Sequence, residues 1–390
     1  MKAVETALAP SLFLQSWRWL TPAVAGAALG ALILAVPSIR ELFQVEGLRW
    51  LYILLFAFLG TGALTPVMVQ VGHRWNLVDT PTDRKIHVLP TPRLGGIAIY
   101  VGFVGSVLLN SILPEWMSAI LAAGSLLLVI GVLDDVRELP ASVKLTGQVV
   151  AAGIVIASGT VLTLFPAGPF GDTANIALTL FWVVGITNAF NFFDGMDGLA
   201  TGLAVLMAAF LGAVAFETNQ AGLGWLAIAM IGAGLGFLPY NFRGREPAMI
   251  FLGDGGSTFI GFTLACLAVK GNWADSNPIV SFSNPLLIFG VLIYDMIHIT
   301  VERIATGKVR SVKAWLDYVG KDHLHHRLER ALGSRQASVA MIFLLTICLG
   351  LAAMALRHAG TTEAMLLLVQ AGLIVAMVTL LEVTGRRRRP

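Results

Sequence analysis

Apolar runs of about 20 residues recur along almost the whole chain, and they limit the fold more than any other feature of the sequence. A bilayer core about 30 Å thick needs roughly 20 apolar residues per helix, with every backbone polar group satisfied inside the segment. Hydrophobic residues make up 56% of the 390 residues and charged residues 13%, at a mean hydropathy of +0.79. The sequence therefore predicts an all-α, polytopic transmembrane helix bundle and excludes a large soluble domain.

Twelve of these runs lie between polar breaks and are predicted to span the membrane. They cover residues 21–37, 48–71, 94–113, 116–133, 144–164, 175–190, 199–216, 221–239, 255–270, 285–302, 337–356 and 364–383. The first run is short, with a signal sequence as its alternative, so we expect eleven or twelve spans. We divide the chain into an extension at 1–47, a transmembrane core at 48–336 that holds the candidate site, and C-terminal spans with a basic tail at 337–390.

Lys and Arg are divided unequally between the two sides of this arrangement. One side carries 22 of them, and the other carries only Arg40, Arg49, Lys270 and Arg357. The positive-inside rule assigns the richer side to the cytoplasm and places both termini there. Because these residues occupy short loops between spans, they report topology, and we expect no nucleic-acid partner.

Most of the aspartates gather on the same predicted cytoplasmic side. Nine lie there: Asp79, Asp83, Asp134, Asp135, Asp194, Asp197, Asp254, Asp317 and Asp322. The acids on the other side, such as Asp172 and Asp275, are single and separated. Acidic residues contribute little to membrane topology, so their clustering needs another cause. We expect a binding or catalytic site on this face.

One loop on this side has a helical pattern of its own. Between residues 311 and 320 the apolar side chains of Val312, Trp315, Leu316 and Val319 follow the spacing i, i+3, i+4, i+7. This spacing places them on one side of a helix. It predicts a short helix lying in the membrane interface.

Asp134 and Asp135 are adjacent carboxylates where a predicted span leaves the membrane. Neighbouring carboxylates repel each other unless a cation or a proton lies between them. The pair therefore suits a metal ion, a general base or both, and a solvated helix end is the alternative.

A second polar segment follows the span at 175–190. Its side chains recur every three residues: Asn188, Asn191, Asp194 and Asp197. They share a face if the helix continues, while the glycines after each aspartate permit a turn close to a ligand. Polar groups at a membrane helix end favour ligand binding, and an Asx-rich capping turn is the alternative.

A third segment, Gly253–Ser257, places Asp254 among glycines, and Asn241 lies shortly before it. Asp254 is a ligand for hard cations, and a helix that opens at Ser257 would offer backbone N–H groups to a phosphate. The alternative is a loop in which Ser257 only caps the helix.

A histidine segment, His323, His325 and His326, directly follows the predicted interfacial helix. On a helix, His323, His326 and Arg330 lie along one side and form a partly cationic surface suited to a pyrophosphate. Zinc binding is an alternative, although the spacing does not match HExxH. A bland polar surface is the other alternative.

The fifth segment is a proline-rich loop on the same side, from Asp79 to Gly96. It holds Lys85, His87 and Arg93 at the membrane surface. Prolines stiffen such a loop, and the cations suit an anionic lipid head group. An ordinary positive-inside loop is the alternative.

With these five segments in this order, from about Asp79 to Arg327, the chain resembles the polyprenyl-phosphate N-acetylhexosamine-1-phosphate transferase superfamily, glycosyltransferase family 4. Its members transfer a sugar 1-phosphate from a UDP-sugar to a polyprenyl phosphate and release UMP. The resemblance implies a Mg²⁺-dependent enzyme of the bacterial inner membrane, with Mn²⁺ as an alternative ion. It also implies an active site on the cytoplasmic side that begins the synthesis of a cell-envelope polysaccharide.

The resemblance also implies roles for individual residues. Catalytic roles fall to Asp134, Asp135, Asp194 and Asp197. Metal binding falls to Asp254, Asn191 and Asp194. Substrate binding falls to Lys85, His87, Arg93, Asn188, Asn191, Asn241, His323, His325 and His326.

The sequence Pro-Thr-Pro-Arg-Leu-Gly-Gly at 90–96, with His-x-His-His, resembles the transferases that use UDP-GlcNAc to start O-antigen, enterobacterial common antigen or teichoic acid. The peptidoglycan branch typically has three consecutive histidines and Thr-Pro-Thr-Met-Gly-Gly. The stretch 307–321 is longer than usual where sugar specificity is expected to be set, so another UDP-sugar is the alternative. Expected partners are a UDP-HexNAc, undecaprenyl phosphate, membrane lipid and, as an option, a second copy of the chain.

Two other classes of membrane protein are alternatives to this resemblance, and each would differ from it in a specific feature. A secondary transporter would place ionisable groups near the bilayer midplane and show two similar halves. A phosphatase or binding module for lipid-linked phosphates would differ only in lacking the nucleotide. Within the transferase reading, direct attack by the lipid phosphate and a route through a phosphorylated aspartate both remain open.

Overall fold

The computed structural model describes residues 20–81, 89–244, 246–273, 278–311, 314, 318, 320, 322–356 and 360–387. Two predicted site residues, Lys85 and His87, lie outside these ranges. So does most of the predicted interfacial helix at 311–320.

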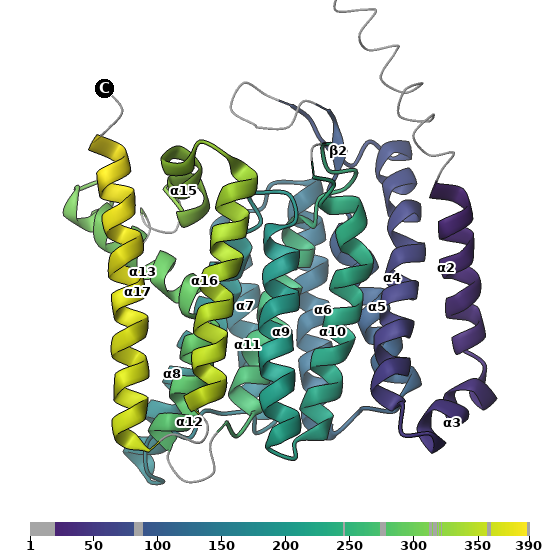
Figure 1. Cartoon of the computed structure of the whole chain (residues 1–390), viewed down its shortest axis with the longest axis horizontal. Coiled ribbons are helices and arrows are strands. Elements are labelled where there is room, and N and C mark those ends of the chain that lie inside the picture. Colours follow the sequence, from purple (N-terminus) through teal and green to yellow (C-terminus); the bar gives the residue numbers. More distant parts are fainter. Residues whose placement is uncertain are drawn as a thin grey trace, which may run out of the picture.

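The described chain is an all-α bundle, as predicted, in which the long helices lie side by side between two end faces (Figure 1). The helices are α2 (Leu20–Leu34), α3 (Pro37–Val45), α4 (Arg49–Arg74), α5 (Gly95–Leu109), α6 (Glu115–Val136), α7 (Ala141–Ala157), α8 (Pro169–Phe192), α9 (Leu199–Glu217), α10 (Ala221–Asn241), α11 (Gly253–Lys270), α12 (Pro278–Ile288), α13 (Gly290–Ala305), α15 (Leu324–Leu332), α16 (Arg335–Leu356) and α17 (Thr361–Arg387). Two short strands, β1 (Val78–Asp79) and β2 (Thr91–Pro92), pair in antiparallel register.

Each of the twelve predicted spans coincides with a helix or with a bent pair of helices. Among the described residues, seven helices are long and apolar enough to cross a bilayer alone, and up to nine crossings result if each bent pair counts as one. The described residues thus give seven to nine crossings by length and composition, fewer than the eleven or twelve predicted. The predicted spans at 94–113 and 144–164 are the shorter apolar helices α5 and α7, and α11, at 255–270, is not among the helices that pass this criterion. The chain is therefore a multi-pass membrane protein.

Two predicted spans have a different shape from the one expected. The segment predicted at 285–302 is the pair α12 and α13, bent by 78°. The first predicted span is α2 followed by α3, bent by 75°. Pro37 lies at the start of α3, where its ring fits a helix start but could not continue the preceding helix.

The helix α11 forms the centre of the bundle, packed between α6, α8, α5 and α9. Its side chains are buried on all sides, including Phe259, Phe262 and Cys266. A helix that is apolar around its whole circumference is stable only when neighbours cover every face. This position fixes the Asp254 end of α11 relative to the helices around it.

Glycines allow α11 to approach α5 and α6 closely at that end. A Cβ atom on Gly96 of α5 would lie 2.2 Å from Cα of Gly256, and one on Gly131 of α6 would lie 2.4 Å from Cα of Gly255. Such backbone contact is possible only between residues without side chains. The ends of α5, α6 and α11 therefore meet at one point.

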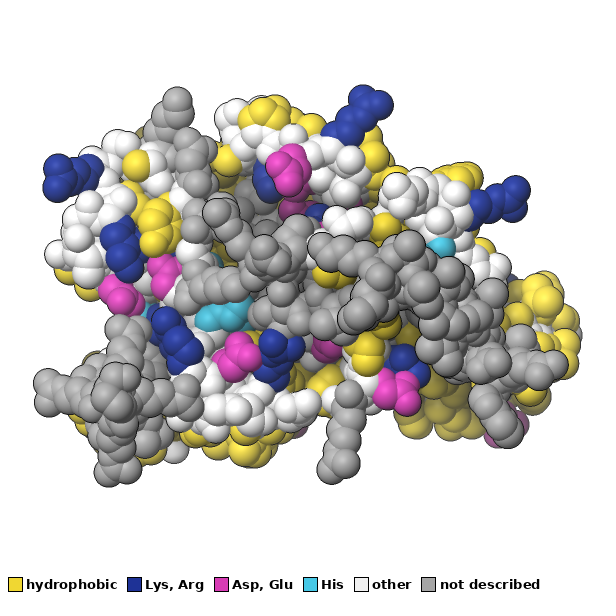
Figure 2. Space-filling view, turned by 90° about the horizontal axis from the view of Figure 1, so that it is seen from above, with side chains coloured by type: hydrophobic (Ala, Val, Ile, Leu, Met, Phe, Trp, Pro, Cys, Tyr) yellow, Lys and Arg dark blue, Asp and Glu magenta, His cyan; other side chains and the backbone are white. Residues whose placement is uncertain are grey.

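The same end of the bundle carries the β1–β2 ribbon and α15 (Figure 1). Seen from this side, Lys, Arg, Asp and Glu side chains are spread over the surface, and histidine is visible between them (Figure 2). The described parts of the polar segments singled out in the sequence thus lie on one face of the protein.

Candidate active site

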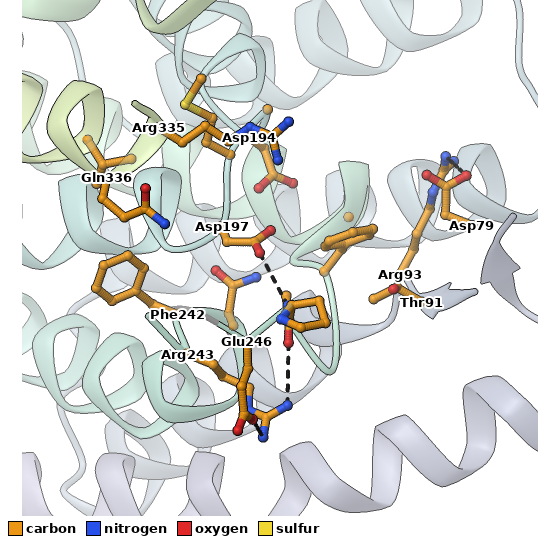
Figure 3. Close-up of a pocket in the computed structure, with 18 of the residues that line it drawn as sticks. Asp79, Thr91, Arg93, Asp194, Asp197, Phe242, Arg243, Glu246, Arg335 and Gln336 are labelled. Atoms are coloured by element: carbon orange, nitrogen blue, oxygen red, sulfur yellow. Dashed lines mark hydrogen bonds and ion pairs between the residues drawn. The ribbon is translucent and has the colours of Figure 1, made fainter. Parts of the chain in front are cut away.

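A cavity of about 590 Å³ opens at this face. Its wall is built from the β1–β2 ribbon, the ends of α6 and α10, the α8–α9 and α10–α11 connections, α15 and the start of α16. In Figure 3, Asp194 and Asp197 lie between the Asp79–Arg93 pair on one side and Arg335 with Gln336 on the other. Segments more than 250 residues apart in the sequence therefore share one cavity.

Asp254 stands at the N-terminal end of α11 and lines this cavity. The preceding Gly253 has φ of +78°, a left-handed conformation that glycine adopts without strain. Asn191 Nδ2 donates a hydrogen bond to Asp254 Oδ1 over 3.1 Å, and Lys144 Nζ lies 3.5 Å from Asp254 Oδ2. Asp254 therefore links α8, α7 and α11.

Asp135 also lines the cavity, but its carboxylate is already engaged. Its Oδ1 accepts the backbone N–H of Asp254 over 3.1 Å, and its Oδ2 accepts that of Gly255 over 3.2 Å. A carboxylate at a helix N-terminus satisfies orphan donors and interacts favourably with the helix dipole. The prediction that the helix opens at Ser257 is wrong, because α11 begins at Gly253. Asp135 accepts two of the N–H groups at this end, and the binding of a phosphate there stays a prediction.

Asp134 points to a different partner from its neighbour. It accepts the backbone N–H of Leu139 over 2.7 Å and pairs with Lys144 Nζ over 2.9 Å. Successive residues of a helix point about 100° apart, so the adjacent carboxylates separate. Asp135 faces the cavity, and Asp134 holds Lys144 near Asp254.

Lys144 was missed as a site residue by the sequence reasoning, which used it only to assign topology. It lies within 3.5 Å of two carboxylates from two helices. The signal was available, since a lysine ten residues after a carboxylate pair begins the next predicted span. Its charge lies where it offsets repulsion between Asp134 and Asp254.

Asp194 and Asp197 lie in the turn between α8 and α9, because α8 ends at Phe192. Burial, followed by the negative charges of Asp254 and Asp135, holds the pKa of Asp194 well above its usual range. Asp197 Oδ2 accepts the backbone N–H of Ala248 over 3.2 Å (Figure 3). Both aspartates line the cavity.

The two other asparagines differ in position from Asn191. Asn188 exchanges hydrogen bonds with Gln148 of α7, so its amide braces α7 against α8. The expectation of one face shared by Asn188, Asn191 and the aspartates is wrong, because the helix ends before Asp194. Asn241 lines the cavity and ties two loops together, accepting from Gly198 N over 2.8 Å and donating to Ile250 O over 3.0 Å.

Arg93 and Asp79 form an ion pair of 2.5 Å beside the β1–β2 ribbon, and both line the cavity. The pairing of the strands sets Asp79 opposite Thr91, two residues before Arg93. The ribbon therefore positions a guanidinium group at the rim of the cavity.

The three histidines occupy different depths. His326 lines the cavity, whereas His323 and His325 are buried behind it, with exposed fractions of 7% and 1%. Neither ring nitrogen of His325 has a hydrogen-bond partner among the described residues. Burial, followed by the nearby charges of His326, His323 and Arg327, holds the pKa of His325 well below its usual range.

The absence of a side chain at Gly195 leaves room for the ring of His325. A Cβ atom on Gly195 would lie 2.5 Å from His325 Nε2, so any larger residue would displace the ring. The turn that carries Asp194 thus packs directly on the histidine segment.

Sequence reasoning also missed Asp295 and Arg303 of α13. Asp295 is fully buried and contacts His323, while Arg303 forms a two-point ion pair with Asp322 at 2.8 Å for each contact. Asp295 lies inside an apolar run, where averaging over about 20 residues hides a single acid. An isolated acid in such a run is itself a signal of function.

Oxygen ligands suited to Mg²⁺ are present at the Asp254 end of the cavity. Among the described residues no three Asp, Glu, His or Cys side chains form a preformed metal cage. Mg²⁺ needs none, because it is usually held by one or two carboxylates with water and substrate phosphates. The mutual repulsion of Asp194, Asp254 and Asp135 is a charge concentration that a cation would relieve, so the residues fit the ion.

Comparison with known proteins covers most of the chain. The glycosyl transferase family 4 model matches residues 117–272. A probable undecaprenyl-phosphate N-acetylglucosaminyl 1-phosphate transferase of Bacillus subtilis is 33% identical over 328 residues, 83% of this chain and 88% of the relative. A decaprenyl-phosphate N-acetylglucosaminephosphotransferase of Mycobacterium tuberculosis is 33% identical over 354 residues, 82% of this chain and 85% of the relative.

A third relative comes from Escherichia coli K12. This undecaprenyl-phosphate alpha-N-acetylglucosaminyl 1-phosphate transferase is 33% identical over 284 residues, 69% of this chain and 74% of the relative. The similarity extends well beyond the motifs, and it agrees with the resemblance that they carry. The chain therefore belongs to glycosyl transferase family 4, the polyprenyl-phosphate N-acetylhexosamine-1-phosphate transferase superfamily.

Proposed function

We propose that this protein transfers GlcNAc 1-phosphate from UDP-GlcNAc to undecaprenyl phosphate and releases UMP, at the cytoplasmic face of the bacterial inner membrane. The observation that carries the proposal is the convergence of Arg93, Asp135, Asp194, Asp254 and His326 on one cavity at a membrane-protein end face. The names of the relatives and the excess of Lys and Arg on this side support the acceptor, the sugar and the orientation.

The reaction joins the lipid phosphate to the sugar-bearing phosphate of the donor. An oxygen of undecaprenyl phosphate forms a bond to the β-phosphorus of UDP-GlcNAc, and the bond from this phosphorus to the bridging oxygen of UMP breaks. UMP leaves with the electron pair of that bond. The product is a lipid diphosphate that carries GlcNAc.

Basic side chains in and beside the cavity suit the negative charge of the two substrates. Arg93 at the rim is suited to seat the lipid phosphate, because a guanidinium binds phosphate oxygens at two points. Lys144 and His326 are suited to the charge of the donor diphosphate. Positioning and charge neutralisation carry most of the catalysis in phosphoryl transfer.

Of the two adjacent aspartates, Asp135 is the one that faces the cavity. Its two hydrogen bonds to the N-terminus of α11 hold the carboxylate in place, so it would orient or deprotonate the lipid phosphate. Asp134 acts on Lys144 instead. Direct attack by the lipid phosphate needs no further carboxylate, and we favour it over a phosphorylated aspartate.

We propose Mg²⁺ as the ion, held by Asp254 and Asp194 together with the phosphates of the donor. Asn191 uses Nδ2 to bind Asp254 and Ser257, which leaves Oδ1 as its candidate ligand atom. When bound, the ion would stabilise the charge that develops on the departing UMP.

The test follows UMP release by the purified protein with undecaprenyl phosphate, Mg²⁺ and a panel of UDP-GlcNAc, UDP-GalNAc and UDP-MurNAc-pentapeptide. We expect the fastest release with UDP-GlcNAc. Asp254→Asn should lose activity, and the matched change Asp172→Asn, at an exposed site in the first turn of α8, should keep it.

Metal binding is measured separately from activity. Added Mg²⁺ should raise the thermal unfolding temperature of the wild type and of Asp172→Asn, but not that of Asp254→Asn. Absence of UMP release with every sugar would overturn the proposed function. Equal stabilisation of all three proteins by Mg²⁺ would overturn the assignment of Asp254 as a ligand.

A further inference from the structure

Asp295 is a buried carboxylate in α13 that contacts the histidine segment at three points, two hydrogen bonds and one ion pair. His323 Nδ1 lies 2.8 Å from Asp295 Oδ2, and the backbone N–H of Leu324 donates to Asp295 Oδ1 over 2.7 Å. Arg327 Nη2 lies 3.4 Å from Asp295 Oδ1. With an exposed fraction of 0%, Asp295 would be costly to bury without these partners.

The contact with His323 fixes which nitrogen the ring turns outward. A carboxylate accepts, so His323 Nδ1 carries the proton in this pair. The other ring nitrogen, Nε2, then faces away from Asp295. On the ring face, Phe192 stacks on His323 with centroids 4.8 Å apart, which restricts rotation of the imidazole.

A continuous row of rings connects this anchor to the cavity. The His323 and His325 rings are nearly parallel, with centroids 6.1 Å apart and an interplanar angle of 8°. The His325 and His326 centroids are 4.2 Å apart, and His326 lines the cavity. Displacement of His323 would therefore be passed to the ring at the cavity wall.

Asp295 also fixes the helix on which two of these histidines lie. His323 precedes the first turn of α15, and the N–H of Leu324 is one of the four at the start of this helix that lack an intrahelical partner. A carboxylate there caps the helix and opposes its dipole. Arg327, one turn later, contacts the same carboxylate.

From these contacts we propose that Asp295 is a positioning residue for phosphoglycosyl transfer: it holds His323 and the first turn of α15 so that His326 meets the donor diphosphate. The inference rests on the proposed function. Asp295 acts through the histidines and touches no substrate itself.

The simpler reading is that Asp295 only stabilises the fold as the partner of Arg327. The two readings differ in a double-mutant cycle, since residues that act as one unit give non-additive losses. Asp295→Asn keeps the shape and removes the charge. His323→Gln removes the imidazole and leaves the carboxylate its contacts with Leu324 and Arg327.

We expect Asp295→Asn to lower kcat/KM for UDP-GlcNAc by about 10- to 100-fold, the size of effect seen when a carboxylate that orients a metal-binding histidine is removed. The double variant should lose about as much as the more impaired single variant. Losses that multiply, or a wild-type kcat/KM in Asp295→Asn, would overturn the proposal.

Asp322→Asn is the matched control, because it breaks the neighbouring ion pair with Arg303 and leaves His323 Nδ1 bonded to Asp295. It should lower thermal stability but reduce kcat/KM less than Asp295→Asn does. An equal loss in both variants would show that anchoring of the segment alone matters, and would overturn the role of the ring.

NMR of ¹⁵N-labelled histidine gives a readout independent of turnover. The wild type should show one ring protonated at Nδ1 in a strong hydrogen bond to a carboxylate. This signal should vanish in His323→Gln and should shift in Asp295→Asn, whose amide oxygen is a weaker acceptor. An unchanged signal in either variant would contradict the pairing. Loss of UMP release in the wild type itself would instead refute the proposed function.

Discussion

Gly131→Ala tests whether the separation of α6 and α11 sets the geometry of the carboxylates. The added Cβ would lie 2.4 Å from both Cα and N of Gly255 and 2.7 Å from the carbonyl carbon of Asp254. Ordinary contacts between carbon atoms are about 3.5–4.0 Å, so the helices must separate by roughly 1–1.5 Å. All the obstructing atoms are backbone, so no side chain can rotate to make room.

Such a shift acts on stability and on activity through different routes. Overpacking of this kind costs about 1–3 kcal/mol. The hydrogen bonds from Asp254 N and Gly255 N to Asp135, now 3.1 and 3.2 Å, would lengthen beyond bonding distance. A misplacement of about 1 Å in a catalytic constellation costs about 10²-fold, so we expect kcat/KM for UDP-GlcNAc to fall by about that factor.

Gly153→Ala provides the matched control, because a Cβ on this residue of α7 meets nothing within 4 Å. It should retain wild-type activity and unfold at an unchanged or slightly higher temperature, since alanine favours helices over glycine. UMP release and thermal unfolding are measured on both variants in the same detergent. A wild-type kcat/KM in Gly131→Ala would refute the reasoning.

Three further changes act at separate points of the site. Lys144→Ala removes the cation between two carboxylates, and kcat/KM should fall about 10²-fold, with partial recovery in Lys144→Arg. Gly195→Ala should displace the ring of His325, and its kcat/KM should fall while the affinity for undecaprenyl phosphate is kept. Burial raises the pKa of Asp322, but the ion pair with Arg303 outweighs burial and holds this pKa below its usual value of about 3.9. The ion pair therefore stabilises the folded protein fully above a pH of about 3.9. This stabilisation is lost as the pH falls through the lower pKa of the folded state. Asp322→Asn should therefore unfold at a lower temperature than the wild type at pH 7, and this difference should shrink as the pH falls below about 4. A wild-type kcat/KM in Lys144→Ala or in Gly195→Ala would contradict these two assignments. For Asp322→Asn, a difference in unfolding temperature from the wild type that does not change with pH would contradict the third.

The helices could be predicted because an apolar run of about 20 residues is a local property of the chain. The bends could not. The pair α12 and α13 turns by 78° at Phe289, whereas the apolar pattern runs on across that point. The two helices differ in how they pack against α16 and α17. Such contacts between distant segments cannot be predicted from the spacing of apolar residues within the pair.

Most of the candidate site follows from its motifs, because polar residues at membrane helix ends are costly without a purpose. The hydrogen-bond and ion-pair partners of these residues could not be predicted from the motifs. The sequence could not separate Asp134 from Asp135, since only the direction of each side chain on α6 sends one to Lys144 and the other to the cavity. It also could not show that Asn188 pairs with Gln148 on another helix.

The identity of the released nucleotide tests the central claim most directly. Transfer of a sugar with its phosphate releases UMP and forms a lipid diphosphate, whereas transfer of the sugar alone releases UDP. Purified protein with undecaprenyl phosphate, UDP-GlcNAc and Mg²⁺ should release UMP in equal amount to a lipid whose mass corresponds to GlcNAc-diphospho-undecaprenol. Release of UDP, or formation of a lipid with a single phosphate, would contradict it.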